Sequence, residues 1–198
     1  NFTDVGTGIL IPFSGGFENG LYIHLPWWMF IVFMFIVFLG TTNGTNFTDG
    51  LDGLLSSVTV LVAVFLTVVA IGTNSGLSPI TSAVAGSLLG FLLFNVYPAS
   101  VFMGDTGSLA LGATLASIAI LTSHEITFII IMGVFIIETL VSIIQVFSIM
   151  YCGRKVFLMT PLHHHFEKLG WNERDIVKTF WVVGLILAMM GVIFAVWV

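Results

Sequence analysis

Long hydrophobic runs alternate with short polar segments along the chain. Each run approaches the roughly 20 apolar residues that a helix needs to cross a bilayer. The six runs cover residues 25–42, 54–72, 79–97, 106–122, 126–150 and 177–197. The strands of a membrane barrel would instead alternate polar and apolar side chains over about ten residues. The pattern therefore predicts an all-α integral membrane protein with six transmembrane helices.

The composition agrees with this class and adds an orientation. Hydrophobic residues make up 58% of the chain and charged residues only 8%, whereas soluble domains carry about 25% charged residues. Lys and Arg occur only between residues 154 and 178: Arg154, Lys155, Lys168, Arg174 and Lys178. Short loops rich in Lys and Arg stay in the cytoplasm. With six crossings, the loops 43–53, 95–108 and 151–176 are then all expected on the cytoplasmic side.

The segment before the first run predicts a small surface hairpin. Gly8 to Phe13 and Gly20 to Leu25 flank the dipeptide Asn19-Gly20, which favours a tight turn between strands. We expect residues 1–26 to form an extracytoplasmic hairpin and residues 27–198 to form one helical bundle. Neither a signal peptide nor an initial methionine precedes the hairpin, so we expect the sequence to begin inside a longer protein.

The first polar segment carries Asn43, Asn46, Asp49 and Asp52 at intervals of three residues. On a helical turn each of these side chains neighbours the next, and together they could bind a cation or a ligand rich in hydroxyl groups. Thr48 or Asp49 could equally cap the helix that follows. The sequence does not decide between these interpretations.

The second polar segment places Asp105 just before a helix expected from about Thr106. Free amides at the start of that helix could bind a phosphate, and Asp105 could hold a magnesium ion. Taken by itself, a helix cap explains this segment somewhat better. Phe102 and Asn95 lie on the approach to the turn, where a planar base could stack and form a hydrogen bond. Ordinary packing at the membrane interface is the alternative.

The third polar segment contains His163, His164 and His165. Three adjacent side chains cannot all point one way on a helix or strand, and the spacing is not that of a zinc-binding helix. We expect a loop that aims His163 and His165 together, where imidazoles could donate to phosphate or transfer protons. The alternative is a set of solvent-facing histidines.

One acidic residue lies inside a hydrophobic run. Glu138 forms a polar stripe with Ser142 and Gln145 at helical spacing, and such a stripe must face protein or a watery cavity. We expect Glu138 to lie near the middle of the membrane, away from the chemistry, and to form a hydrogen bond between helices.

Three runs carry a resemblance to a known family. They are NGTNFTDGLDG at residues 43–53, FMGDTGSLALG at 102–112 and PLHHHFEKLGWNE at 161–173. With them the chain resembles the bacterial phospho-N-acetylmuramoyl-pentapeptide transferase family, or translocase I, over nearly its whole length. This family belongs to the polyprenyl-phosphate N-acetylhexosamine-1-phosphate transferase superfamily.

The resemblance implies a magnesium-dependent enzyme of the bacterial inner membrane with a cytoplasmic active site. Such an enzyme transfers phospho-N-acetylmuramoyl-pentapeptide from its UDP carrier to undecaprenyl phosphate and forms lipid I and UMP in peptidoglycan synthesis. The implied catalytic residues are Asp49, His163 and Asp105, and Asp105 is also the magnesium ligand. The implied substrate-binding residues are Asn43, Asn46, Asp52, Asn95, Phe102, His164 and His165.

The chain also departs from the family pattern. Full-length members resemble ten-helix bundles with an aspartate pair and a lysine in the first half, and neither feature occurs here. We therefore expect this chain to be the last six helices and to be inactive by itself. The expected partners are the two substrates, membrane lipids and a second copy in a homodimer, without nucleic acid. The alternatives are another transferase of the superfamily, a membrane transporter or a scaffold.

Overall fold

The computed structural model describes the chain except residues 1–6, 12–13, 15–19, 123 and 197–198. Its elements in chain order are β1 (Gly8–Leu10), β2 (Tyr22–His24), α3 (Trp27–Thr48), α4 (Leu54–Gly72), α5 (Ser78–Asn95), α6 (Gly104–Leu121), α7 (Glu125–Ile131), α8 (Gly133–Cys152), α9 (Leu162–Lys168) and α10 (Glu173–Val196). Six of these helices are long and apolar enough to cross a membrane. The predictions of an all-α fold and of six transmembrane helices are confirmed.

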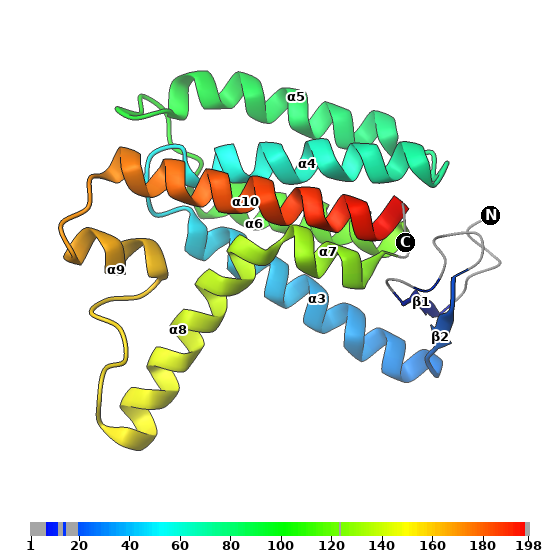
Figure 1. The fold of residues 1–198 in the computed structure, drawn as a ribbon, viewed down its shortest axis with the longest axis horizontal. Coiled ribbons are helices and arrows are strands. Elements are labelled where there is room, and N and C mark those ends of the chain that lie inside the picture. Colours follow the sequence, from blue (N-terminus) through cyan, green and yellow to red (C-terminus); the bar gives the residue numbers. More distant parts are fainter. Residues whose placement is uncertain (1–6, 12–13, 15–19, 123, 197–198) are drawn as a thin grey trace.

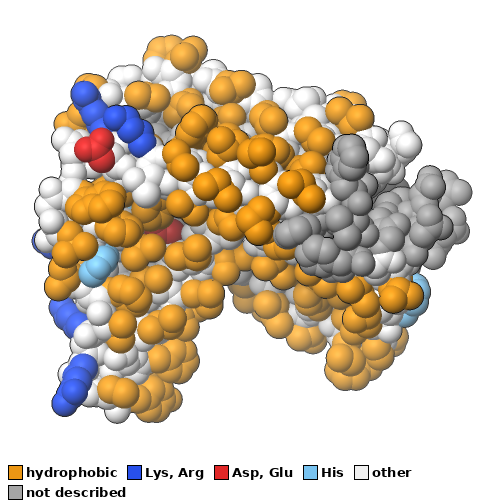
Figure 2. Space-filling model, in the orientation of Figure 1, with side chains coloured by type: hydrophobic (Ala, Val, Ile, Leu, Met, Phe, Trp, Pro, Cys, Tyr) orange, Lys and Arg blue, Asp and Glu red, His pale blue; other side chains and the backbone are white. Residues whose placement is uncertain are grey.

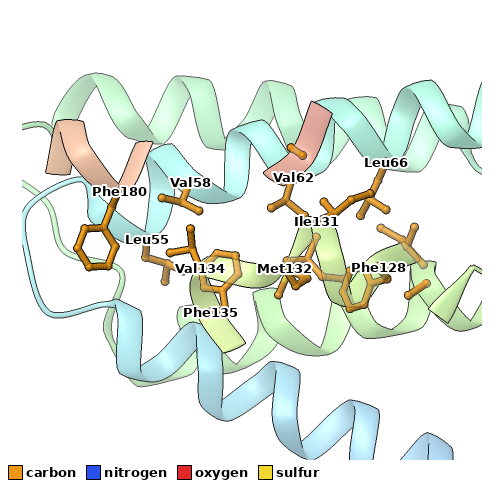
Figure 3. Packing of buried hydrophobic residues seen from close by; sticks show 14 of the residues in the cluster. Leu55, Val58, Val62, Leu66, Phe128, Ile131, Met132, Val134, Phe135 and Phe180 are labelled. Atoms are coloured by element: carbon orange, nitrogen blue, oxygen red, sulfur yellow. The ribbon is translucent and has the colours of Figure 1, made fainter. Parts of the chain in front are cut away.

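The long helices form a bundle around α4. Helix α4 packs against α5 and α10, whereas α3 packs against α6 and α8 (Figure 1). The core lies between α4, α6, α7, α8 and α10 (Figure 3). Its members include Leu55, Val58, Val62, Leu66, Phe128, Ile131, Phe135 and Phe180. Lipid tails cannot drive helices together by hydrophobicity, so this close packing and interhelical hydrogen bonds hold the bundle.

Strands β1 and β2 form the antiparallel pair expected from the sequence, with Ile9 opposite Ile23. The expected turn at Asn19-Gly20 falls partly outside the described residues. The location of this hairpin outside the cytoplasm stays a prediction.

Helices α3 and α6 approach each other closely near their polar ends. The hydroxyl of Thr45 donates to the carbonyl of Ser108 at 2.9 Å. A Cβ atom at Gly112 would lie only 2.3 Å from Thr45 Oγ1 and 2.7 Å from the Cα of Thr42. Only glycine therefore permits this approach, which brings the first and second polar segments together.

The prediction of one helix over the fifth hydrophobic run, 126–150, is wrong. The structure divides it into α7 and α8, with Met132 between them. A Cβ atom at Gly133 would lie 2.7 Å from Leu187 of α10, so the chain is pressed against α10 at this point. Helix α7 then packs on α10 while α8 packs on α3 and leans away from the bundle (Figure 1).

The polar segments gather at one end of the bundle. The turn between α3 and α4, the connection between α5 and α6, and α9 all lie at this end, and the hairpin lies at the other (Figure 1). The visible Lys and Arg side chains lie at the same end as α9 (Figure 2). The structure thus places the three segments together, while the assignment of this end to the cytoplasm stays a prediction.

Candidate active site

The first polar segment forms the end of one helix and the turn after it. Helix α3 continues through Thr48, and Asp49 occupies its C-cap position. The N-cap position of α4 is Gly53, without a side-chain hydrogen bond. The alternative in which Thr48 or Asp49 caps the following helix is therefore wrong. The hydrophobic pattern ended this helix too early, because the last two turns of α3 are polar and extend beyond the expected span.

The second segment places Asp105 inside the first turn of α6. This helix begins at Gly104, and its N-cap residue, Met103, forms no side-chain cap. The capping interpretation of Asp105 is also wrong. Asn46 of α3 donates from Nδ2 to Asp105 Oδ1 at 3.1 Å and to Ser108 Oγ at 3.0 Å. The amide of Asn46 thus joins the first and second polar segments and orients the exposed Asp105 carboxylate.

Two carboxyl groups share this part of the site. Burial and the negative charge of Asp105 raise the pKa of Asp49 to about 6, against the opposing effect of a hydrogen bond from the Gly104 backbone. Within the described part of the chain, neither carboxylate forms an ion pair with Lys or Arg. The local electrostatics therefore favour a bound cation.

The third segment is a short helix, α9, so the expectation of a loop is wrong. His163 is completely buried, whereas His164 and His165 are partly exposed. His165 Nδ1 accepts a hydrogen bond from the Leu158 amide at 3.1 Å. His164 Nδ1 contacts the Glu167 carboxylate one turn further along the helix. The three rings therefore face different partners, and the expectation that His163 and His165 point together is wrong too.

Glu138 is the partner of His163. Its Oε1 lies 3.1 Å from His163 Nδ1, and its carboxylate also accepts hydrogen bonds from the amides of Leu162 and His163. The placement of Glu138 away from the chemistry is therefore wrong. Since α8 leans outward and α9 folds back against it, an acid inside a transmembrane helix meets the histidine segment. The hydrogen bond expected between helices exists, but it reaches α9.

The other ring nitrogen of His163 faces the first polar segment. A Cβ atom at Gly50 would lie 2.2 Å from His163 Nε2, far closer than real side chains come. The turn beside Asp49 and the buried histidine are therefore in direct contact. All three polar segments converge on one site.

This contact predicts the effect of a small substitution. Because Glu138 prevents the His163 ring from retreating, Gly50→Ala should lower the free energy of unfolding by about 1–3 kcal/mol. Thermal unfolding of the protein in lipid would measure the loss. Gly90→Ala is the matched control, since a Cβ atom there meets nothing within 4 Å. Equal unfolding temperatures for Gly50→Ala and the unaltered protein would contradict the contact.

Two further predicted site residues form hydrogen bonds that shape the connections. Asp52 Oδ2 accepts from the Ala99 amide at 2.8 Å, and its own amide donates to Glu173 Oε1 at 2.8 Å. Asn95 is buried, accepts from Ser56 Oγ at 2.6 Å and donates to the carbonyl of Val101 at 3.0 Å. Both residues hold the α5–α6 connection in place, and their contact with substrate stays a prediction.

The remaining predicted residues lie at the margin of the site. Phe102 is 72% exposed, so its ring is free to stack on a planar group. Asn43 is exposed and donates to the Leu39 carbonyl of its own helix at 2.8 Å. Contact of Asn43 and Phe102 with substrate stays a prediction.

The sequence comparisons identify the family of the chain. Residues 4–123 match the sequence profile of glycosyl transferase family 4. The chain belongs to this family.

Full sequences of family members extend the comparison. The chain is similar to proteins named phospho-N-acetylmuramoyl-pentapeptide-transferase from Desulforamulus reducens, with 47% identity over 189 residues, Shouchella clausii, with 49% over 193, and Bacillus velezensis, with 45% over 198. The matches cover 95%, 96% and 100% of this chain but 55%, 57% and 59% of those relatives. The chain thus spans little more than half of their length.

In this glycosyl transferase family 4 chain, the donor set at the site fits magnesium. Within the described residues, no three His, Cys, Asp or Glu side chains cluster in a way that could hold a metal. Magnesium needs fewer protein ligands, because it usually binds one or two carboxylates and keeps water or phosphate oxygens as its other ligands. Asp49 and Asp105 supply two such carboxylates, and Asn46 fixes the orientation of one of them.

Sequence reasoning missed three residues of this glycosyl transferase family 4 site. Ser108 accepts from Asn46 inside the bundle, Glu173 holds the turn at Asp52, and Glu138 holds His163. Ser108 and Glu173 lay within the motifs but carried no separate signal. Glu138 did carry one, since an acid in a hydrophobic run is a candidate functional residue.

Proposed function

We propose that the protein, at the full length of its relatives, transfers phospho-N-acetylmuramoyl-pentapeptide from its UDP carrier to undecaprenyl phosphate. The products are lipid I and UMP. The reaction takes place at the cytoplasmic face of the bacterial inner membrane and depends on magnesium. The names of the relatives and the resemblance of the three motifs support the substrates, and the single site at one end of the bundle supports the chemistry.

The carboxylate pair next to a buried histidine is the observation that carries the proposal. A phosphoryl transfer needs positioning and neutralisation of the charge that spreads over the phosphate oxygens. Asp105 is exposed and held by Asn46, while burial and the charge of Asp105 raise the pKa of Asp49. A transporter or a scaffold has no need for two carboxylates held close together at one edge of the membrane.

Each group of the site has a distinct role in this proposal. Asp49 and Asp105 would hold magnesium, which supplies positive charge to the phosphates when bound. Asn46 keeps the Asp105 carboxylate oriented through its hydrogen bond. His163 presents Nε2 toward the Asp49–Gly50 turn, where the ring moves a proton during the transfer. The exposed Phe102 ring stacks on the base of the nucleotide.

Magnesium binding should weaken at acid pH. Protons compete with the cation at Asp49, whose pKa is raised to about 6. At pH 5 protonation should weaken magnesium binding about tenfold relative to pH 7.5, because one carboxylate is then mostly neutral. Magnesium titrations monitored by thermal unfolding, without substrate, would measure this at both pH values. In Asp49→Asn the pH effect should be much smaller, and an unchanged effect would remove Asp49 from the metal site.

The decisive experiment for the function uses a full-length form of the protein in lipid vesicles. UDP-N-acetylmuramoyl-pentapeptide and undecaprenyl phosphate should yield UMP and a lipid-linked product only when magnesium is present. UDP-N-acetylglucosamine in place of the muramoyl donor tests another transferase of the superfamily. Turnover of that donor alone would reassign the substrate, and the absence of UMP with both donors would refute the proposed transfer.

A further inference from the structure

We propose that Glu138 is a positioning residue that fixes the ring of His163, with Nδ1–H toward the Glu138 carboxylate and Nε2 toward the Asp49–Gly50 turn. The inference rests on the function proposed above and adds the group that controls the state of the histidine. It starts from a single contact, the 3.1 Å approach of His163 Nδ1 to Glu138 Oε1. Both side chains are at most 1% exposed, so water does not compete for this contact.

The carboxylate determines which ring nitrogen carries hydrogen. An ionised carboxylate only accepts hydrogen bonds, so the nitrogen that faces it must be the donor. In the neutral imidazole the other nitrogen, Nε2, then keeps a lone pair. A histidine held in this way accepts a proton at Nε2 while the neighbouring carboxylate stabilises the resulting cation.

The backbone of α9 fixes the carboxylate itself. The amides of Leu162 and His163 donate to the two oxygens of Glu138. These bonds tie the acid to the same short helix that carries the histidine ring. The ring and its partner therefore form one rigid unit, and rotation of the imidazole would break the contact at Nδ1.

The opposite side of the ring has no partner among the described residues. His163 Nε2 is buried and makes no hydrogen bond. It points at Gly50, where even a methyl group would lie 2.2 Å away. A buried nitrogen without a partner costs free energy, and a functional role is one reason for a protein to retain it. The free nitrogen therefore faces the turn that follows Asp49.

A purely structural role for Glu138 makes different predictions. In that case the acid only anchors α9, and the ring could carry its hydrogen on either nitrogen. Loss of Glu138 would then lower the amount of folded protein without a specific effect on turnover. The two roles therefore differ in the state of the ring and in the coupling between the two residues.

The state of the ring can be observed directly. The full-length protein, labelled with nitrogen-15 in its histidine rings and placed in lipid vesicles, is examined by solid-state nuclear magnetic resonance at pH 7.5. His163→Asn identifies the His163 signals by their loss. We expect a protonated Nδ1. A bare Nδ1 with hydrogen on Nε2 would overturn the proposal, and this measurement needs no change at Glu138.

The coupling can be measured by a double-mutant cycle. Glu138→Gln should lower kcat for UMP release about tenfold to a hundredfold, with KM changed less than about threefold. Adding Glu138→Gln to His163→Asn should lower kcat no more than about twofold further. If the kcat losses of the two substitutions instead multiply in the double mutant, the proposal is overturned. Ser142→Ala is the control, because its hydroxyl donates only to the backbone of its own helix and the activity should not change.

The two readouts separate this inference from the proposed function. A protonated Nδ1 in a protein that releases no UMP would refute the transferase proposal and leave the positioning of His163 intact. UMP release by a protein with a bare Nδ1 would support the transferase proposal and refute the positioning of His163. All comparisons are made at equal amounts of membrane-embedded protein.

Discussion

Replacing Asp105 by Asn is expected to lower UMP release by the full-length protein about a thousandfold while the bundle stays folded. The substitution removes one negative charge from the expected magnesium site, and loss of such a charge costs about 4 kcal/mol of transition-state stabilisation. The structure explains why folding should survive. The side-chain oxygen of Asn can still accept the hydrogen bond from Asn46 that now spans 3.1 Å.

Two further measurements make the Asp105 experiment specific. Without the negative charge of Asp105, one cause of the raised pKa of Asp49 disappears, so that pKa should move down from about 6. Asp175→Asn is the matched control, because Asp175 is exposed and its carboxylate pairs with Lys178 at 3.5 Å rather than with Asn46. Near-normal turnover of Asp105→Asn in a folded protein would exclude the carboxylate from the chemistry.

Removing the His163 side chain should damage both activity and folding. His163→Ala leaves Glu138 buried without its ring partner, which costs about 1–3 kcal/mol of stability. The same change removes Nε2 from the site and should lower turnover at least a hundredfold. The amount of folded protein in the membrane and the UMP release must therefore be measured in the same preparation.

A second substitution separates these two effects. His163→Asn places an amide N–H near the position of Nδ1, so the contact with Glu138 and the stability should largely remain. Turnover should still fall about tenfold to a hundredfold, because nothing replaces Nε2. His24→Ala, an exposed change on β2, serves as the control. Full activity of His163→Asn would show that the ring nitrogen facing Gly50 has no part in the reaction.

The membrane-spanning helices could be predicted because they depend on local physics. A run of about 20 apolar residues is stable in lipid as a helix whatever its neighbours are. The break between α7 and α8 could not be predicted in this way. No proline marks the break, and the need for glycine at position 133 arises only from the contact with Leu187 of α10. Such a break is a property of the packed bundle.

The sequence predicts which residues belong to the site better than it predicts how their side chains are arranged. Asp49, Asp105 and His163 stood out because polar residues are rare in this chain, and the structure brings their segments together. The pairing of His163 with Glu138 spans 25 residues and depends on the lean of α8. No periodicity along the sequence encodes that contact. The histidine segment was expected to be a loop because His163 and His165 were expected to point together, whereas in α9 they face different partners.

The hydrogen bond between the Asp52 amide and Glu173 closes the site across 121 residues of sequence. At about 5–20 residues per second, roughly 6 to 24 s of synthesis separate the two partners. The contact between Asn46 and Asp105 spans 59 residues, so it can form in the earlier part of this interval. The acidic half of the site can therefore assemble before the histidine helix is synthesised and packs against it. The order of synthesis thus separates the two halves of the candidate site in time.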